Sequence, residues 1–269
     1  MSNHDVNHML EVPGARLHYQ VKGSGPVLLM PPMDAGGYRA LAAALAEQYT
    51  VITYDPRGFG MSTVADPEQD LTPELAADDA RRVLSAVTSG PADVFGSSGG
   101  AVTGLALVSD QPGRVRTLIA HEPPVVELLA DHAEVQAALD GVTDTYRDEG
   151  AQAAYSRFFS VIGLAPPPGA MTMPETRLPD PAWVFLHCIP PTTRYHPDIA
   201  TLRAAPTRIV IGRGETSPGQ LNHRTATALA QQLGIQPVEF PGDHIGFATN
   251  PAQFAAVLRR VLQETPEQR

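Results

Sequence analysis

The sequence predicts an α/β protein built on a mostly parallel sheet with helices on both faces. Three observations support this fold class. Strand-like and helix-like segments alternate through the first 121 residues, and the alternation resumes after residue 205. The strand segments are short apolar runs, typical of strands buried on both faces. The chain has 269 residues and is 43% hydrophobic, enough for one large domain that carries an insertion.

The first half of the chain opens with a hairpin and then alternates. Residues 10–12 and 16–21 are alternating stretches separated by Pro13 and Gly14. Thr72 is suited to cap a helix that Pro73 begins and Gly90 ends. The other elements expected here are strands at Val27–Met30, Thr50–Tyr54, 92–95 and 116–120, and helices at 37–48 and 98–109.

The same alternation returns near the C-terminus. We expect strands at 207–211 and 237–240, with a helix at 222–233 between them that Gly234 stops. Asn250 and Pro251 are expected to cap a final helix. Its buried face should be formed by Phe254, Val257, Leu258 and Val261.

The segment between these two halves has a different character. It contains helical patterns at about 125–147, at Ala151–Ile162 and around Trp183–Cys188, and a Pro-rich stretch at 166–181. We therefore expect a core domain from residues 1–121 and 206–269, with a helical cap at 122–205 over one end of the sheet.

Composition limits the partners of the protein. The formal net charge is −10, from 19 Lys and Arg against 29 Asp and Glu, without a basic run. Nucleic acid is therefore a poor partner, because its binding requires clustered cations. No apolar run is long enough to span a membrane, and the single cysteine, Cys188, excludes an intrachain disulfide. We expect a cytoplasmic monomer or homodimer that acts on a small molecule.

The most informative motif is the G-x-S-x-G pattern at residues 96–100. It follows an apolar strand directly and precedes a helix, and a sharp turn between two such elements requires glycine on both sides of the serine. The turn would expose the Ser98 hydroxyl at a helix N-terminus, which favours a developing oxyanion. The alternative is a Gly-Ser loop that closes an ordinary strand–helix crossover.

A serine nucleophile requires a general base. The sequence has nine histidines. Only His244 follows the last predicted strand through a short loop with Pro and Gly, which would bring it to the same sheet edge as Ser98. Seven of the other histidines are interpreted as surface or packing residues: His4, His8, His18, His132, His187, His196 and His223.

Four segments together resemble the α/β-hydrolase family, in particular its ester-hydrolase and perhydrolase-like members. These segments are residues 23–32, 54–62, 96–100 and 241–244. The resemblance covers nearly the whole chain. It implies a serine hydrolase that works without a cofactor. The nucleophile would form an acyl-enzyme, because the turn at residues 96–100, called the nucleophile elbow in this family, carries serine rather than aspartate. The charged residues of the 54–62 segment, Asp55 and Arg57, are interpreted as ties between loops.

Two carboxylates compete for the role of orienting the base. Glu215 follows a strand in Gly212-Arg213-Gly214-Glu215, which resembles the Gly-x-x-Asp pattern that usually supplies the acid in this family. Glu122 follows the strand at 116–120, a position that some relatives use instead. Glu215 is favoured on this resemblance, and at least one of the two should be buried beside His244.

The oxyanion hole is expected to use two backbone N–H groups. One belongs to Gly99, directly after the nucleophile. The family usually carries His-Gly in the loop after the Val27–Met30 strand, whereas this chain has Pro31 and Pro32, which have no N–H to donate. Met33 is the first residue of that loop that can donate.

The insertion supplies aromatic residues that could contact a substrate. We name Phe158, Phe159, Trp183 and Phe185, and we expect a largely uncharged, partly hydrophobic substrate. No His-x-x-x-His motif or carboxylate cluster suggests a metal site. The first functional hypothesis is hydrolysis of a carboxylic ester or lactone. The alternatives are perhydrolysis or C–C bond cleavage with the same residues, or a non-catalytic ligand-binding protein on the same fold.

Overall fold

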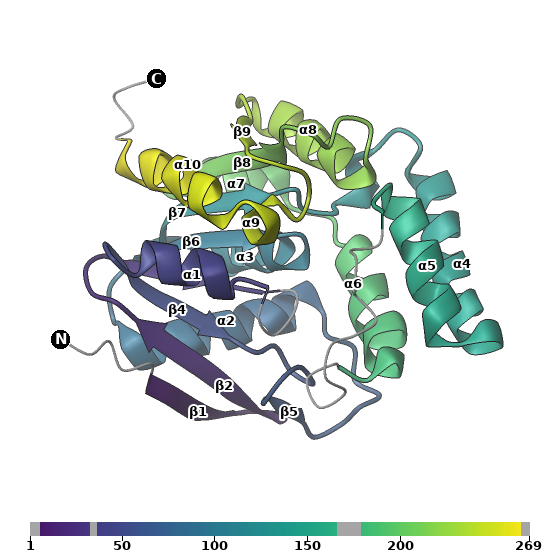
Figure 1. The fold of residues 1–269 in the computed structure, drawn as a ribbon, viewed down its shortest axis with the longest axis horizontal. Coiled ribbons are helices and arrows are strands. Elements are labelled where there is room, and N and C mark those ends of the chain that lie inside the picture. Colours follow the sequence, from purple (N-terminus) through teal and green to yellow (C-terminus); the bar gives the residue numbers. More distant parts are fainter. Residues whose placement is uncertain (1–5, 33–36, 166–178, 265–269) are drawn as a thin grey trace.

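The centre of the protein is a nine-stranded sheet (Figure 1). The structure is a computed structural model that describes residues 6–32, 37–165 and 179–264. The strand order is β1-β2-β4-β3-β6-β7-β8-β9, and β5 pairs with β2. The strands are β1 (Val6–Val12), β2 (Ala15–Lys22), β3 (Val27–Met30), β4 (Thr50–Tyr54), β5 (Thr63–Val64), β6 (Ala92–Ser97), β7 (Val115–His121), β8 (Arg208–Gly214) and β9 (Val238–Phe240).

Strand direction places several chain turns at one edge of the sheet. β1, β2 and β5 pair antiparallel, and so do β2 and β4. From β4 through β3, β6, β7 and β8 to β9 every pair is parallel. The carboxyl ends of these strands therefore lie along a common edge, where open α/β sheets place their ligand sites.

Two groups of helices bury the two faces of the sheet. The helices of the core are α1 (Arg39–Leu45), α2 (Pro73–Val87), α3 (Gly99–Asp110), α7 (Ile199–Ala204), α8 (Leu221–Leu233), α9 (Gly246–Thr249) and α10 (Pro251–Gln263). Residues of α2, α3, α7 and α8 share one apolar cluster, and those of α1 and α10 share the other. A short 3-10 turn, η1 (Pro112–Arg114), precedes β7.

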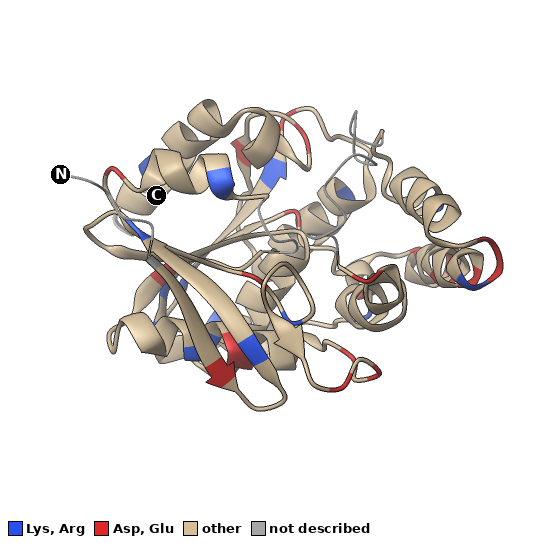
Figure 2. Cartoon of the chain, turned by 60° about the horizontal axis from the view of Figure 1, so that its bottom comes forward, with Lys and Arg blue, Asp and Glu red and all other residues tan. Residues whose placement is uncertain are grey.

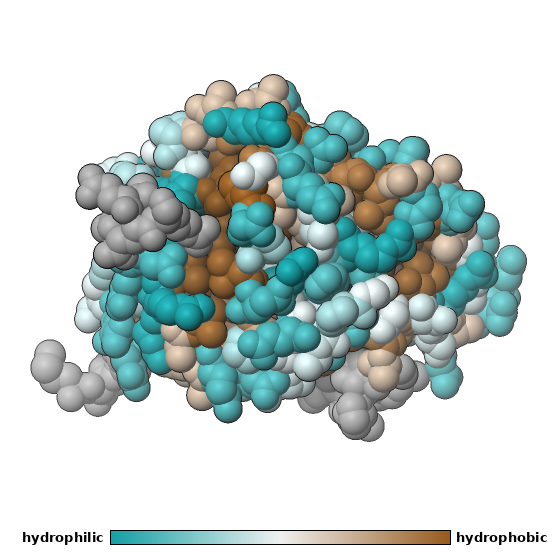
Figure 3. All heavy atoms as spheres, turned by 90° about the horizontal axis from the view of Figure 1, so that it is seen from above, coloured by the Kyte–Doolittle hydropathy of each residue, from teal (hydrophilic) through white to brown (hydrophobic). Residues whose placement is uncertain are grey.

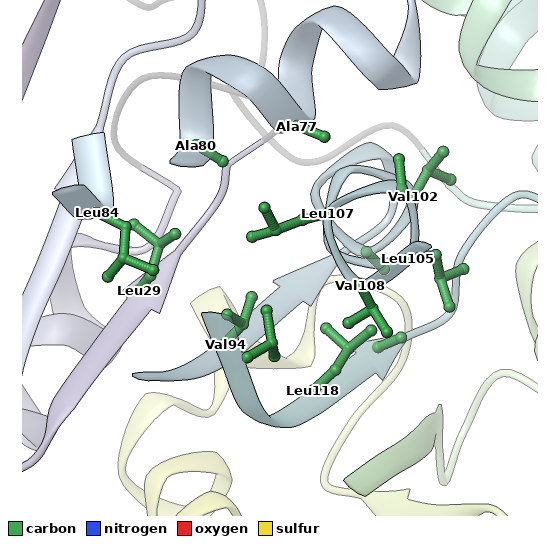
Figure 4. Packing of buried hydrophobic residues seen from close by; sticks show 14 of the residues in the cluster. Leu29, Ala77, Ala80, Leu84, Val94, Val102, Leu105, Leu107, Val108 and Leu118 are labelled. Carbon is green, nitrogen blue, oxygen red and sulfur yellow. The ribbon is translucent and has the colours of Figure 1, made fainter. Parts of the chain in front are cut away.

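The side-chain alternation of the strands explains this division. In β3, Leu29 belongs to the cluster under α2 and α3, whereas Leu28 and Met30 belong to the cluster under α1 and α10. Successive residues of a strand point to opposite faces, so a strand buried on both sides reads as a continuous apolar run. Figure 4 shows α3 packed between α2 and the strands through side chains such as Leu107 and Leu118.

The described part of the segment between β7 and β8 is helical. Its elements are η2 (Val126–Leu128), α4 (His132–Glu149), α5 (Ala151–Ile162), the π-helical turn η4 (Trp183–Cys188) and α6 (Ile189–Thr193) before α7. α4, α5 and α6 stand together beside one end of the sheet (Figure 1). The Trp183 indole N–H donates to the carbonyl of Arg57 at 2.9 Å, which ties η4 to the turn after β4.

The predicted strands and most predicted helices are confirmed, with local differences. Thr72 accepts a hydrogen bond from the Leu75 N–H at 3.2 Å and caps α2 as expected. Asn250 stands at the N-cap position of α10, but its side chain makes no capping hydrogen bond, and its amide donates to the Thr249 hydroxyl at 3.0 Å. α4 begins at His132, since the chain first forms a 3-10 turn at Val126–Leu128. β5 was not predicted, and most of the Pro-rich stretch, residues 166–178, lies outside the described residues.

The surface shows few exposed large hydrophobic side chains. Among the described residues these are Met9 and Met61, and on the face drawn in Figure 3 hydrophobic patches are separated by hydrophilic residues. Lys and Arg are interspersed with Asp and Glu over several elements (Figure 2). None of the described helices has the length and apolar character needed to cross a bilayer.

Candidate active site

Ser98 occupies a strained turn between β6 and α3. Its backbone has φ 56° and ψ −128°. Residues other than glycine rarely adopt a backbone conformation with positive φ. The Ser98 N–H donates to the carbonyl of His121 at 3.0 Å, and the Ser98 carbonyl accepts from the Ala101 N–H at 2.9 Å. The turn is thus held from both sides, as expected for backbone strain that the surrounding structure maintains.

The two glycines of the motif are required by contact with neighbouring backbone. A Cβ atom on Gly96 would lie 2.2 Å from the carbonyl oxygen of Gly100. A Cβ atom on Gly100 would lie 2.1 Å from the carbonyl oxygen of Pro31. These distances are far below any van der Waals contact, so the strand, the turn and the helix can approach this closely only without side chains there.

Tyr38 supports the turn from the α1 side. Its buried hydroxyl accepts a hydrogen bond of 2.7 Å from the Ser97 N–H, and its ring packs against Phe95 and Phe247. Sequence reasoning did not single out Tyr38, because nothing in the chain before α1 indicates a partner 59 residues away.

His244 reaches the same edge from the loop after β9. Ser97 of β6 lies in register with His121 of β7, so the next residues, Ser98 and Glu122, follow adjacent parallel strands. The Nδ1 atom of His244 lies 2.8 Å from Oε2 of Glu122. The histidine and one carboxylate therefore meet at the carboxyl edge of the sheet, the edge at which β6 ends and the Ser98 turn begins.

Glu122 is fully buried and bound through both oxygens. Its backbone has φ 46°, and its Oε1 accepts from the Gly214 N–H at 2.9 Å and from the Ser217 hydroxyl. Burial alone would raise the pKa of Glu122. The hydrogen bond from His244, the electrostatic attraction of the His121 and His244 rings and the hydrogen bond from the Ser217 hydroxyl outweigh burial and lower the pKa to about 2. Glu122 is therefore a carboxylate across the neutral pH range.

The expectation that favoured Glu215 does not match the structure. Glu215 is exposed, and its backbone N–H donates to the carbonyl of Phe240. β8 is paired with β9 up to Gly214, and the N–H of Gly214 points to the Glu122 carboxylate. The side chain that contacts His244 is consequently Glu122, the alternative that the sequence had left open.

A second histidine lies beneath this pair. The His121 ring is 6.4 Å from the His244 ring, centroid to centroid, and nearly parallel to it. The Nδ1 atom of His121 is 2.9 Å from the Ser97 hydroxyl, and Nε2 is buried without a partner among the described residues. Burial lowers the pKa of His121 to about 4, so the ring is neutral at neutral pH.

Asn222, at the start of α8, contacts the ring of His244. The Asn222 Nδ2 atom lies 2.8 Å from Nε2 and 3.1 Å from Nδ1 of His244, so it approaches both ring nitrogens. Within the described part of the chain, the Ser98 hydroxyl is in no hydrogen bond. Neither a motif nor a spacing in the sequence pointed to Asn222, because its contact with His244 depends on how α8 is placed.

One of the two predicted oxyanion donors can be placed. Gly99 is the first residue of α3, where a helix leaves N–H groups without intrahelical partners. Gly99 also lines a cavity of about 30 Å³ that begins beside the elbow. Met33 lies outside the described residues.

The walls of this cavity differ from the predicted substrate contacts. None of Phe158, Phe159, Trp183 and Phe185 lines it. Phe185 packs against Tyr146 and Tyr155, and Phe158 contacts Phe159, because these aromatic side chains form the apolar interior of the helical segment. The cavity is lined instead by residues from β4 and the segment between β4 and α2, from α2, from α3 and from the helical segment, among them Tyr54, Phe59, Leu71, Val102, Cys188 and Thr192.

The described residues also contain no group of three His, Cys, Asp or Glu side chains placed to hold a metal ion. The arrangement that remains is a strained serine at a helix N-terminus, an imidazole and a buried carboxylate.

Known proteins resemble the chain in sequence and in fold. The family model of the alpha/beta hydrolase fold matches residues 30–162. An uncharacterized hydrolase, YraK, of Bacillus subtilis (strain 168) is 34% identical, covering 96% of each chain. A zearalenone hydrolase of Bionectria ochroleuca is 27% identical, covering 93% of this chain and 95% of that protein. The enol-lactonase structure from Burkholderia xenovorans LB400 superposes with a TM-score of 0.71 at 20% identity, covering 96% of this chain and all of that one (100%). The chain belongs to the alpha/beta-hydrolase fold family.

Proposed function

We propose that the protein is a serine hydrolase that cleaves a carboxylic ester or lactone through an acyl-enzyme on Ser98. The observation that carries the proposal is the buried contact between His244 and Glu122, 2.8 Å apart, at the same sheet edge as the strained Ser98 turn. A fully buried carboxylate is costly to maintain unless it is paired, and here its partner is the imidazole that a serine nucleophile requires.

The residues divide the chemistry as follows. The Ser98 oxygen attacks the acyl carbon while Nε2 of His244 takes the hydroxyl proton. Glu122 accepts from Nδ1–H and stabilises the imidazolium that forms. The Gly99 N–H stabilises the negative charge on the carbonyl oxygen. His244 then protonates the leaving alcohol, and water hydrolyses the acyl-enzyme by the same route.

The cavity beside Gly99 supports an uncharged substrate. Among the described residues, the charged side chains on its wall are Arg57 and Asp79. They neutralise each other through two hydrogen bonds of 2.6 and 2.7 Å, which leaves no free charge for an ionic group. The cavity has a volume of about 30 Å³, which suits a small uncharged group of the substrate.

The names of the relatives favour cleavage of an ester or lactone over perhydrolysis or C–C bond cleavage. One is named a zearalenone hydrolase and one structural neighbour an enol-lactonase. We therefore place hydrolysis first and a small molecule as the partner.

Labelling and turnover test the proposal together. We expect a fluorophosphonate to label the protein and the label to disappear in Ser98→Ala, with turnover of p-nitrophenyl esters or lactones lost in parallel. Ser156→Ala, an exposed serine of α5, is the control and should behave like the wild type. Labelling that persists in Ser98→Ala would contradict the assignment, and a folded wild type that is neither labelled nor active would favour a ligand-binding protein. A neutral ester should react faster than its carboxylate-bearing analogue.

A further inference from the structure

Tyr54 is the last residue of β4, and its side chain lines the cavity beside Gly99. The residue is 5% exposed, and its hydroxyl is in no hydrogen bond within the described part of the chain. Buried hydroxyl groups normally have a partner, and an unpaired one destabilises a fold. Phenylalanine would fill the same space without this cost, so packing alone gives no reason for a tyrosine here.

The surroundings place the Tyr54 hydroxyl near both the cavity wall and the nucleophile turn. Tyr54 belongs to the apolar cluster under α2 and α3, so its side chain points to the face of the sheet that these helices cover. Asp79 of α2 and Tyr38 both act electrostatically on the Tyr54 hydroxyl. Asp79 lines the same cavity, and the Tyr38 hydroxyl accepts from the N–H of Ser97, the residue before the nucleophile.

Tyr54 is a neutral hydrogen-bond donor in this cavity. Burial raises the pKa of the Tyr54 hydroxyl well above its usual value, and Asp79 adds to the rise, so the phenol keeps its proton. The two carboxylate oxygens of Asp79 accept from Arg57. Thr103, on the α3 wall, donates its own hydroxyl to the Gly99 carbonyl at 3.1 Å. The charged groups of the wall are therefore paired with each other, whereas the phenol hydrogen remains to be used.

We propose that the Tyr54 hydroxyl donates a hydrogen bond to a second oxygen of the substrate, so that the protein prefers small esters or lactones with a keto or hydroxyl oxygen close to the ester group. The phenol supplies the hydrogen, and the keto or hydroxyl oxygen supplies the lone pair. An analogue with a methyl group in place of that oxygen leaves the phenol unpaired in the complex and is a poorer substrate. This inference rests on the proposed ester hydrolysis and names a substrate class for it.

Two matched pairs of esters test this preference. Ethyl 3-oxobutanoate and ethyl 3-methylbutanoate exchange an oxygen for a methyl group on the acyl side, and 2-oxopropyl acetate and 2-methylpropyl acetate do so on the alcohol side. Tyr54→Phe removes only the hydroxyl. We expect it to lower kcat/KM by about tenfold for the oxo ester whose oxygen reaches the cavity, and by less than about twofold for its methyl analogue.

Tyr19→Phe is the matched control, because Tyr19 is paired with Tyr54 across β2 and β4 but stacks on His8. It should leave the values for all four esters unchanged. Equal losses for an oxo ester and its methyl analogue in Tyr54→Phe would show a packing role and overturn the inference, as would unchanged values for all four. The free energy of unfolding of Tyr54→Phe should not fall, and a clear loss would reveal a partner for the hydroxyl within the protein and contradict the proposal.

Binding without turnover separates this inference from the proposed function. Calorimetry on Ser98→Ala gives the Kd of each intact ester, with and without Tyr54→Phe in the same chain. Tighter binding of an oxo ester that is lost in the double variant supports the role of Tyr54 even if the wild type cleaves no ester, in which case only the proposed function fails. Binding that does not distinguish the oxo esters from their methyl analogues overturns the inference, whether or not the wild type is an esterase.

Discussion

At the scale of single residues, the site depends on one buried carboxylate whose two oxygens both accept hydrogen bonds. Glu122 accepts hydrogen bonds from His244, Gly214 and Ser217 and has no exposure to solvent. Glu215 is exposed on the neighbouring loop. This difference turns two acids that look equivalent in sequence into a matched pair for mutagenesis.

Glu122→Gln should lower kcat by about 10³–10⁴-fold, because the amide no longer favours the Nδ1–H form of His244 or stabilises its protonated form. Glu215→Gln removes the same charge from the same edge and should change kcat by less than about twofold. Steady-state kinetics on a neutral ester provides the comparison. Equal losses in the two variants would rule out Glu122 as the orienting acid.

At the scale of elements, a buried ion pair joins the turn after β4 to α2. Arg57 is 1% and Asp79 2% exposed, and Arg57 also donates to the carbonyl of Pro13 at 2.7 Å. Burial raises the pKa of Asp79, and the Arg57 guanidinium opposes this rise. The sequence interpretation of Arg57 as a tie between loops is confirmed. The pair forms part of the cavity wall, so its integrity also shapes the candidate site.

Arg57→Met should lower the free energy of unfolding by about 3–5 kcal/mol, because it leaves the Asp79 carboxylate buried without its partner. Chemical denaturation followed by circular dichroism measures the loss. The double variant Arg57→Met with Asp79→Leu removes both charges and should recover most of it. A double variant as unstable as the single one would show that the loss comes from packing and not from an uncompensated charge.

At the scale of the whole molecule, acid should destabilise the fold in a defined window. Burial lowers the pKa of His121 from 6.5 to about 4, so between these values the unfolded chain binds a proton that the native protein does not. The stability that the neutral ring contributes is complete above about pH 6.5 and falls by roughly 3 kcal/mol as the pH drops to about 4. Glu122, with its pKa lowered to about 2, adds a further loss below about pH 4.5.

The free energy of unfolding measured at several pH values tests this behaviour. In His121→Gln the decline between about pH 6.5 and 4 should be shallower, since the titrating group is gone, and the difference between the two curves isolates the histidine. Parallel curves for wild type and His121→Gln would show that other groups cause the acid sensitivity.

Much of the fold and part of the site could be predicted because the deciding interactions are local. The strands of the parallel region are continuous apolar runs, and such runs identify strands that are covered on both faces. The turn at Ser98 needs Gly96 and Gly100 because their Cβ atoms would collide with nearby backbone, so its pattern is recognisable in a few letters. The short loop after β9 likewise restricts where His244 can lie.

The sequence by itself therefore determined the α/β architecture, the strained serine and the histidine that faces its edge. Only the tertiary structure decided which acid contacts that histidine and that Asn222 packs against its ring. Both contacts depend on the register of β7 against β8, on the backbone conformation of Glu122 and on the placement of α8. Such contacts join residues about 20 to 120 positions apart, a distance over which neither spacing nor residue type carries a signal.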